Sequence, residues 1–225
     1  YKVVATPINK ERRKVNNIFV DEIFLKIDKL LIEASEVQQS GDIEIALKLY
    51  DEILKMSPGN VMAHIGMGDC YMKLQHADNA KACFDKAIQV DPNNSKSWLR
   101  LGLLALNKND NKKADICFNK CLDNDPINDR AYCGLGMVRV NLNDLDGAVH
   151  YFCKSLDSNF ENLSACKYLL EISYKLKKFG EIENYLNKFI EFHPANLNMR
   201  FGLAGIQYKT GNLEDALKNL EYILA

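Results

Sequence analysis

The sequence predicts an all-α fold, built as a solenoid of helical hairpins. The first observation is a proline series with a constant period, formed by Pro58, Pro92, Pro126 and, two periods later, Pro194. The second is an alanine series in the same register, with members at Ala46, Ala80, Ala114, Ala148 and Ala216. The third is a large side chain four residues after each alanine, and after Ile182 where the alanine series has a gap, at Tyr50, Phe84, Phe118, Phe152, Leu186 and Leu220. A constant period of this length is typical of stacked supersecondary units.

Each part of the period has a physical reason. Proline lacks an amide proton, so it ends the second helix of a unit. Small residues let the two helices of a hairpin approach closely, and the large residues fill the space between neighbouring hairpins. Polar turns such as Thr210-Gly211-Asn212 separate the helices, and no segment alternates with the two-residue period of a strand. The expected units are 27–60, 61–94, 95–128, 129–162, 163–196 and 197–225.

The end of the fourth unit and the fifth unit depart from the pattern. Phe160 stands in the proline series, Ile182 stands in the alanine series, and Leu170 replaces a small residue. We therefore expect a local change of curvature where the fourth unit meets the fifth.

The third unit carries the most complete motif, which consists of Trp98, Leu101, Gly102, Ala114, Phe118 and Pro126. It resembles the pattern W-x2-L-G-x2-Y, A-x3-F, P of the tetratricopeptide repeat, whose units are about 34 residues long. The resemblance covers residues 27–225 in one register. It implies a right-handed superhelical solenoid in which the first helices of successive units line a concave groove that holds proteins or peptides.

Residues 1–26 do not fit the repeat. They are expected to form an N-terminal lead-in followed by a capping helix or arm, because apolar residues recur at helical spacing from Val15 onward. A helix that covers the first unit is one interpretation, since the ends of solenoids need capping. An arm that docks in a groove is the other.

Composition narrows the classes of partner. The net charge of −1 and the pI of about 6.5 argue against a nucleic-acid partner, and no apolar run is long enough for a membrane span. The seven cysteines are odd in number and follow no secretory signal, which favours a reduced, cytoplasmic location. The chain starts at Tyr1 and stops within a helical pattern, so we expect a piece of a longer protein.

No residue pattern indicates catalysis, a cofactor or a metal site. Cys117 and Cys121 lie four apart on one helix face and are interpreted as small core residues. His150 and Cys153 lie one helical turn apart, but their spacing implies no group that would orient the histidine. We therefore predict that this segment is not an enzyme.

The resemblance also implies which residues contact a partner. Carrying the family's inner-face positions onto this sequence gives Lys96, Leu99, Arg100, Leu103, Arg130, Cys133, Met137, Lys167, Tyr168 and Tyr174. The third unit is apolar nearly all round, which predicts an exposed apolar strip for binding. The alternative is that tighter curvature buries these residues. The cations Lys96, Arg100 and Arg130 are expected to cluster and to favour an acidic ligand.

The favoured function is a non-catalytic scaffold or adaptor that holds an apolar or acidic peptide, or an amphipathic helix, in this groove. Two alternatives stay open. The N-terminal arm could fill the groove of a second copy and give a homo-oligomer. The chain could also be an accessory interaction module of a multidomain enzyme such as a glycosyltransferase.

Overall fold

The computed structural model describes the backbone of residues 8–225 and the side chains of residues 21–180 and 182–225. All regular structure in this part of the chain is helical, so the all-α prediction is confirmed. The chain forms two compact units, residues 1–100 and 101–225, and each is described by itself. None of the described helices is long and apolar enough to cross a membrane.

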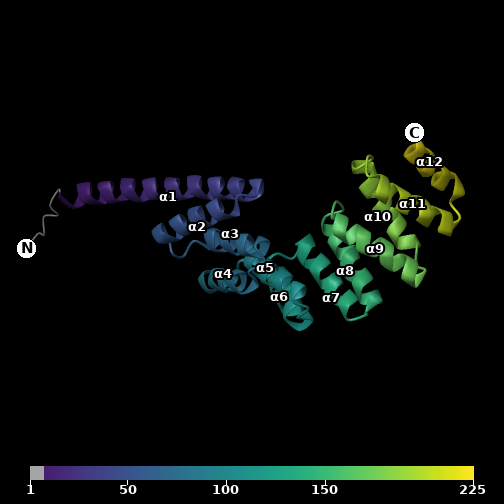
Figure 1. Ribbon diagram of the computed structural model, residues 1–225, viewed down its shortest axis with the longest axis horizontal. Helices are drawn as coiled ribbons and strands as arrows, with labels where there is room; N and C mark the ends of the chain where they lie inside the picture. The colour runs from purple at the N-terminus through teal and green to yellow at the C-terminus, as the bar shows by residue number, and fades with distance from the viewer. Residues whose placement is uncertain (1–7) are drawn as a thin grey trace, which may run out of the picture. The chain divides into compact units, whose positions relative to one another are not determined.

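The first unit consists of α1 (Ile8–Ser40), α2 (Ile43–Met56), α3 (Val61–Lys73) and α4 (Ala77–Val90). α5 (Ser95–Asn107) begins in the first unit and ends in the second. The second unit continues with α6 (Asn111–Asn124), α7 (Asp129–Asn141), α8 (Leu145–Ser158), α9 (Leu163–Leu176), α10 (Gly180–Phe192), α11 (Leu197–Thr210) and α12 (Leu213–Leu224). Consecutive helices pack as antiparallel hairpins, and each hairpin packs on the next within its unit (Figure 1).

α1 runs without a break from Ile8 to Ser40. The first helix of the first repeat and the segment before it are therefore one helix. The predicted boundary between residues 26 and 27 falls inside this helix, and residues 1–7 lie outside the described part.

An asparagine at each repeat boundary begins the first helix of the next hairpin. The N-cap residues, each one repeat after the last, are Asn60, Asn94, Asn128, Asn162 and Asn196. The side-chain oxygen of each accepts a hydrogen bond of 2.9–3.1 Å from the backbone N–H three residues later. This bond satisfies one of the N–H groups that a helix start leaves without a partner.

The carbonyl oxygen of each proline in the series also accepts a hydrogen bond. Four chemically different side chains donate to the proline carbonyl oxygen six residues earlier: His64 to Pro58 (2.9 Å), Trp98 to Pro92 (2.7 Å), Tyr132 to Pro126 (3.0 Å) and Arg200 to Pro194 (3.2 Å). His64 makes this bond through Nε2, so it does more than fill space. These bonds tie each connecting loop to the helix that follows it.

The fourth-to-fifth junction uses a different arrangement, because Phe160 replaces the proline and the buried Cys166 replaces the donor. Here the Asp129 carboxylate accepts hydrogen bonds from the side-chain amides of Asn159 (3.3 Å) and Asn162 (2.8 Å). The Ser155 hydroxyl donates to the Asp129 carbonyl oxygen at 2.8 Å. A polar network therefore holds this junction. The irregularity extends into the fifth hairpin, where α9 and α10 pack far less extensively than α7 and α8. The expected change of curvature stays a prediction.

The turn inside every hairpin has one residue in the left-handed conformation. These residues, each one repeat after the last, are Gly41, Gln75, Asn109, Asn143, Lys177 and Gly211, with φ between 55° and 102°. Glycine adopts this conformation without strain, and asparagine tolerates it. Gln75 and Lys177 are neither, so the second and fifth turns store backbone strain.

Replacing Lys177 with glycine should therefore stabilise the protein. Relief of the left-handed strain is worth about 1–2 kcal/mol, and the entropy of glycine offsets about 0.5–1 kcal/mol of it. We expect the melting temperature to rise by about 2–4 °C per kcal/mol gained, measured by thermal unfolding with circular dichroism. The matched control is Lys175→Gly in the last turn of α9, which should lower the melting temperature, because glycine has a low helix propensity and the ion pair with Glu171 is lost.

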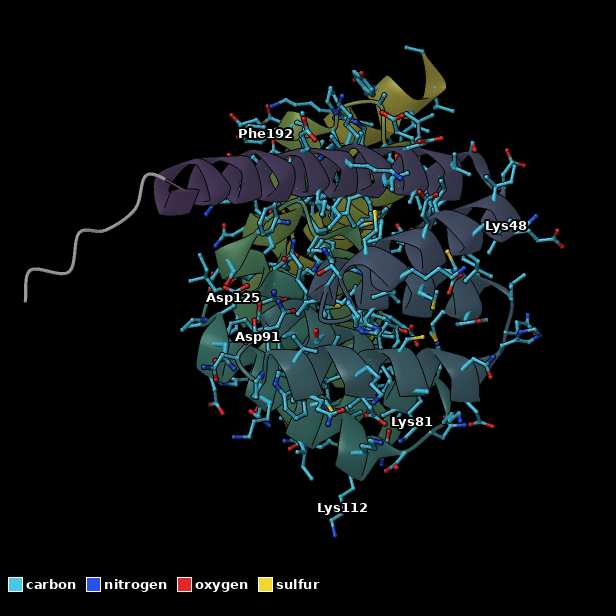
Figure 2. The ribbon with its side chains drawn as sticks, turned by 90° about the vertical axis from the view of Figure 1, so that its left-hand side faces the viewer. Lys48, Lys81, Asp91, Lys112, Asp125 and Phe192 are labelled. Atoms are coloured by element: carbon cyan, nitrogen blue, oxygen red, sulfur yellow. The ribbon has the colours of Figure 1, made fainter. Side chains whose placement is uncertain are left out.

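The cores of both units consist of the repeat residues. Phe84, Phe118 and Phe152 are completely buried, as are Ala80, Ala114 and Ala148. A β-carbon on Gly102 would lie 2.7 Å from the Phe118 ring, and one on Gly134 would lie 2.4 Å from it. The ring therefore fills the space between the first helices of two successive hairpins, as the sequence predicted. Charged side chains such as Lys48 and Lys112 point outward from their helices (Figure 2).

Candidate partner-binding site

A concave depression of about 240 Å³ lies in the second unit. It is lined by residues of α5, α7 and α9, the first helices of three successive hairpins, and of the turn after α5. We call it the α5–α7–α9 pocket. Its lining residues are Leu106, Asn107, Asn109, Met137, Val140, Asn141 and Tyr168. The apolar members form a floor of buried or half-buried side chains. The three asparagines form an exposed rim of amide groups around it.

The floor is positioned by the repeat itself. Tyr168 stands at the repeat position that Gly134 occupies one repeat earlier. Its ring stacks on the ring of Phe152, with centroids 5.2 Å apart and an interplanar angle of 1°. Phe152 is completely buried, so the tyrosine ring has a fixed support. Met137 and Val140 lie three residues apart on α7 and therefore share one helix face. The pocket is thus largely preformed.

The rim presents hydrogen-bonding groups in fixed orientations. The Asn141 side-chain amide donates to Asn111 Oδ1 at 2.9 Å, which orients Asn141 and leaves its carbonyl oxygen able to accept a further bond. Asn109 is the left-handed residue of its turn, with φ 58°. Carboxamides both donate and accept, so a rim of this kind can pair with the backbone of a peptide. The apolar floor can hold one apolar side chain.

The structure brings two of the predicted contact residues, Met137 and Tyr168, together in this pocket. Lys167 and Arg130 are exposed on α9 and α7 of the same unit. Leu103 is half-buried. Tyr174 is 42% exposed, and its ring meets Phe179 edge to face at 5.5 Å.

The expected exposed apolar strip is corrected at several positions. Leu99 is only 5% exposed and Cys133 only 6%, and Leu104 and Leu106 are buried as well. Cys133 belongs to the core cluster around Phe152, so its side chain faces packed neighbours instead of solvent. Leu99 and Cys133 therefore offer a partner almost no surface. For these two residues the alternative interpretation, that the inner-face residues are buried, agrees with the structure.

In the first unit, Lys96 is exposed, whereas Arg100 is a quarter exposed and pairs with Asp69 at 2.8 Å. This ion pair joins α5 to α3. The predicted cluster of Lys96, Arg100 and Arg130 extends over both units and stays a prediction.

The sequence interpretation missed the amide rim. Asn107 and Asn141 lie one repeat apart, at the ends of the first helices of two successive hairpins. The same comparison across repeats that revealed the prolines would have found them. Asn109 carries a weaker signal, because asparagine is common in turns for reasons unrelated to binding.

Models of the tetratricopeptide repeat match the sequence at residues 38–101 with one model and at 95–128 and 129–162 with another. These matches cover more than half of the chain. The chain belongs to the tetratricopeptide-repeat family. The family resemblance drawn from the sequence is thereby confirmed. No curated protein sequence gives a significant match.

Several solved structures share the tetratricopeptide-repeat fold. PilF of Pseudomonas aeruginosa is 18% identical, with a TM-score of 0.74 over 88% of this chain and 89% of PilF. PilW, described as a widely conserved type IV pilus biogenesis factor, is 20% identical, with a TM-score of 0.69 over 86% of this chain and 90% of PilW. YrrB, described as a tetratricopeptide-repeat protein with an unusual peptide-binding site, is 18% identical, with a TM-score of 0.57 over 78% of this chain and 90% of YrrB. At these identities the likeness concerns the fold.

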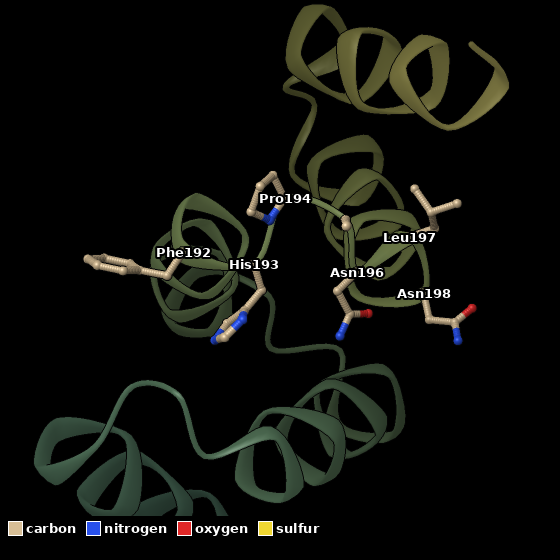
Figure 3. A pocket seen from close by; sticks show the side chains of 7 residues that line it. Phe192, His193, Pro194, Asn196, Leu197 and Asn198 are labelled. Carbon is tan, nitrogen blue, oxygen red and sulfur yellow. The ribbon is translucent and has the colours of Figure 1, made fainter.

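A larger depression, of about 780 Å³, surrounds the loop between α10 and α11 of this tetratricopeptide-repeat chain. Phe192 and Leu197 point away from one another there, and His193 and Asn196 point to a third side (Figure 3). His193 also lies 3.6 Å from the Glu161 carboxylate. The lining groups do not converge on one volume, so we do not assign a ligand site to this loop.

Four thiols of the repeats are poor nucleophiles. Burial raises the pKa of Cys121, Cys133 and Cys166 to about 12 and that of Cys70 to about 11. The nucleophilic form of cysteine is the thiolate, so these side chains are inert at neutral pH. Among the described residues, no three His, Cys, Asp or Glu side chains are placed to hold a metal ion.

Proposed function

We propose that this chain is a non-catalytic scaffold that binds a peptide in the α5–α7–α9 pocket. The observation that carries the proposal is the combination of an apolar floor with a rim of three carboxamides. The volume is smaller than the roughly 300–1,000 Å³ of small-molecule sites, and it suits a single side chain of a longer ligand. YrrB, which shares the fold, is described as having an unusual peptide-binding site of its own. We also propose a cytoplasmic location, on the sequence argument that the seven cysteines are odd in number.

The nearby cations suggest the charge of the ligand. Arg130 is exposed seven residues before Met137 on α7, so both lie on one helix face about 10 Å apart along the axis. An extended peptide covers this distance with about three residues. We therefore propose a ligand with an apolar residue for the pocket and an acidic residue about three positions away.

Selection of random peptides on the intact chain tests this function. Peptides that combine one large apolar residue with Asp or Glu about three positions away should be enriched. A Met137→Glu/Val140→Glu variant should bind the selected peptides at least about tenfold more weakly, because the floor becomes charged. An Arg130→Glu variant should lose the preference for acidic residues.

The matched control is Ile116→Glu, which charges an apolar side chain that is 53% exposed on α6 outside the pocket. It should leave binding unchanged, and circular dichroism should show equal helicity for all variants. Equal binding by the Met137→Glu/Val140→Glu variant would reject the pocket as the site. Failure of any peptide to be enriched would reject peptide binding as the function.

A further inference from the structure

The ring of Tyr168 gives the α5–α7–α9 pocket an aromatic wall. Tyr168 is half-buried, lines the pocket and packs against the core cluster that contains Phe152. The two rings are parallel, so Phe152 covers one face of the tyrosine ring. The surface that Tyr168 turns to the pocket is therefore its other face or its edge. Among the residues that the structure describes, no second ring stacks on Tyr168 and no cation lies over it.

The packing of the hairpins does not require a ring at this position. The equivalent residues one repeat before and one repeat after are Gly134 and Gly202. A β-carbon on Gly134 would lie 2.4 Å from Phe118, and one on Gly202 would lie 2.5 Å from Leu170. In both places a side chain of the preceding hairpin takes the space. In the fifth hairpin the first helix itself contributes a large side chain, and that side chain lines the pocket.

The other lining groups favour an aromatic ligand residue. None of the lining residues carries a charge, so a charged side chain would enter the pocket without an ionic partner. An aliphatic side chain would gain only from the apolar area that it buries. An aromatic side chain gains that area and also an offset-stacked or edge-to-face contact with Tyr168. Met137 supplies a thioether, whose sulfur makes favourable contacts with aromatic rings.

We propose that Tyr168 makes the pocket selective for an aromatic side chain, so that the bound peptide places Phe, Tyr or Trp in it. This selectivity rests on the proposed function, and it specifies which class of ligand residue enters the pocket. Tyr168 is then the residue that determines specificity, whereas the aliphatic part of the floor contributes apolar area to any ligand.

Two peptides that differ in one ring test this selectivity. Both have the sequence Asp-Gly-Gly-X-Gly-Gly-Asp with blocked ends, which places an acidic residue three positions from X on either side. X is phenylalanine in one peptide. In the other it is cyclohexylalanine, which has nearly the same size but no π system. NMR signals of methionine methyl groups, labelled with ¹³C in the intact chain, report binding. The signal that disappears in Met137→Leu is the one in the pocket.

The phenylalanine peptide should bind about three- to tenfold more tightly than the cyclohexylalanine peptide, because an aromatic pair contributes about that much beyond the area it buries. Tyr168→Leu keeps the wall apolar and should make the two peptides bind equally. Tyr168→Phe should retain the preference. The matched control, Tyr208→Leu, removes a ring that is 65% exposed on α11 outside the pocket, and it should also retain the preference.

Three results would overturn this selectivity. The first is equal or tighter binding of the cyclohexylalanine peptide to the unmodified chain, which would leave the proposed function intact with a pocket that reads only apolar area. The second is a preference for phenylalanine that persists in Tyr168→Leu, because another residue would then select the ring. The third is the absence of any change at the Met137 methyl group with either peptide. The proposed function is judged separately, by whether the selection of random peptides enriches any sequence.

Discussion

Phe118→Ala should destabilise the second unit by about 3–5 kcal/mol, the cost of removing a fully buried aromatic side chain. The Phe118 ring has no exposed surface, and it lies against the backbone at both Gly102 and Gly134. Its removal leaves a cavity between two successive hairpins. Rigid helix backbones border this cavity, so neighbouring side chains cannot fill it easily. The loss should appear as a lower midpoint in urea unfolding, followed by far-UV circular dichroism.

Phe201→Ala is the matched control. Phe201 is 65% exposed on α11 of the same unit, so the same substitution there should change the free energy of unfolding by less than about 0.5 kcal/mol. Similar losses for both variants would show that the space between hairpins is not filled as described.

Gly134→Leu should destabilise the same interface by the opposite mechanism. Its β-carbon would lie 2.4 Å from Phe118 Cζ, closer than van der Waals contact allows, and the rest of the leucine would need still more room. Overpacking of this kind typically costs about 1–3 kcal/mol, and the rigid surroundings favour the upper end. Equilibrium unfolding in urea measures this loss directly.

The double variant Phe118→Ala/Gly134→Leu separates these mechanisms. The leucine should enter the cavity left by the phenylalanine, so the double variant should be more stable than the sum of the single losses by about 1–3 kcal/mol. Simple additivity within about 0.5 kcal/mol would mean that the two residues do not share the same space.

Features that recur once in every repeat were predictable from the sequence. The buried Phe84, Phe118 and Phe152 were expected between hairpins, and they lie there. The asparagine caps and the left-handed turn residues obey the same period, so sequence comparison of the repeats could have found them. The left-handed Gln75 and Lys177 could not have been assigned from residue type alone, because neither residue favours that conformation.

The exposure of the groove residues was not predictable in the same way. Leu99 and Cys133 occupy positions that line the concave surface in the family, yet they are buried here. The local pattern places a residue on a helix face, but the side chains packed on that face decide how much of it water reaches. Cys133 is covered because residues of neighbouring hairpins pack around it in the cluster that contains Phe152.

The sequence by itself determined the helical class, the repeat and its register, and the residues that fill the space between hairpins. The reason is local: proline, small residues and large residues each stand at a fixed position of the repeat, where they end a helix, let two helices approach or fill the space between hairpins. Only the tertiary structure decided which inner-face residues form the α5–α7–α9 pocket, and that Arg100 pairs with Asp69. These properties depend on contacts between helices, and the same residue pattern is compatible with either outcome.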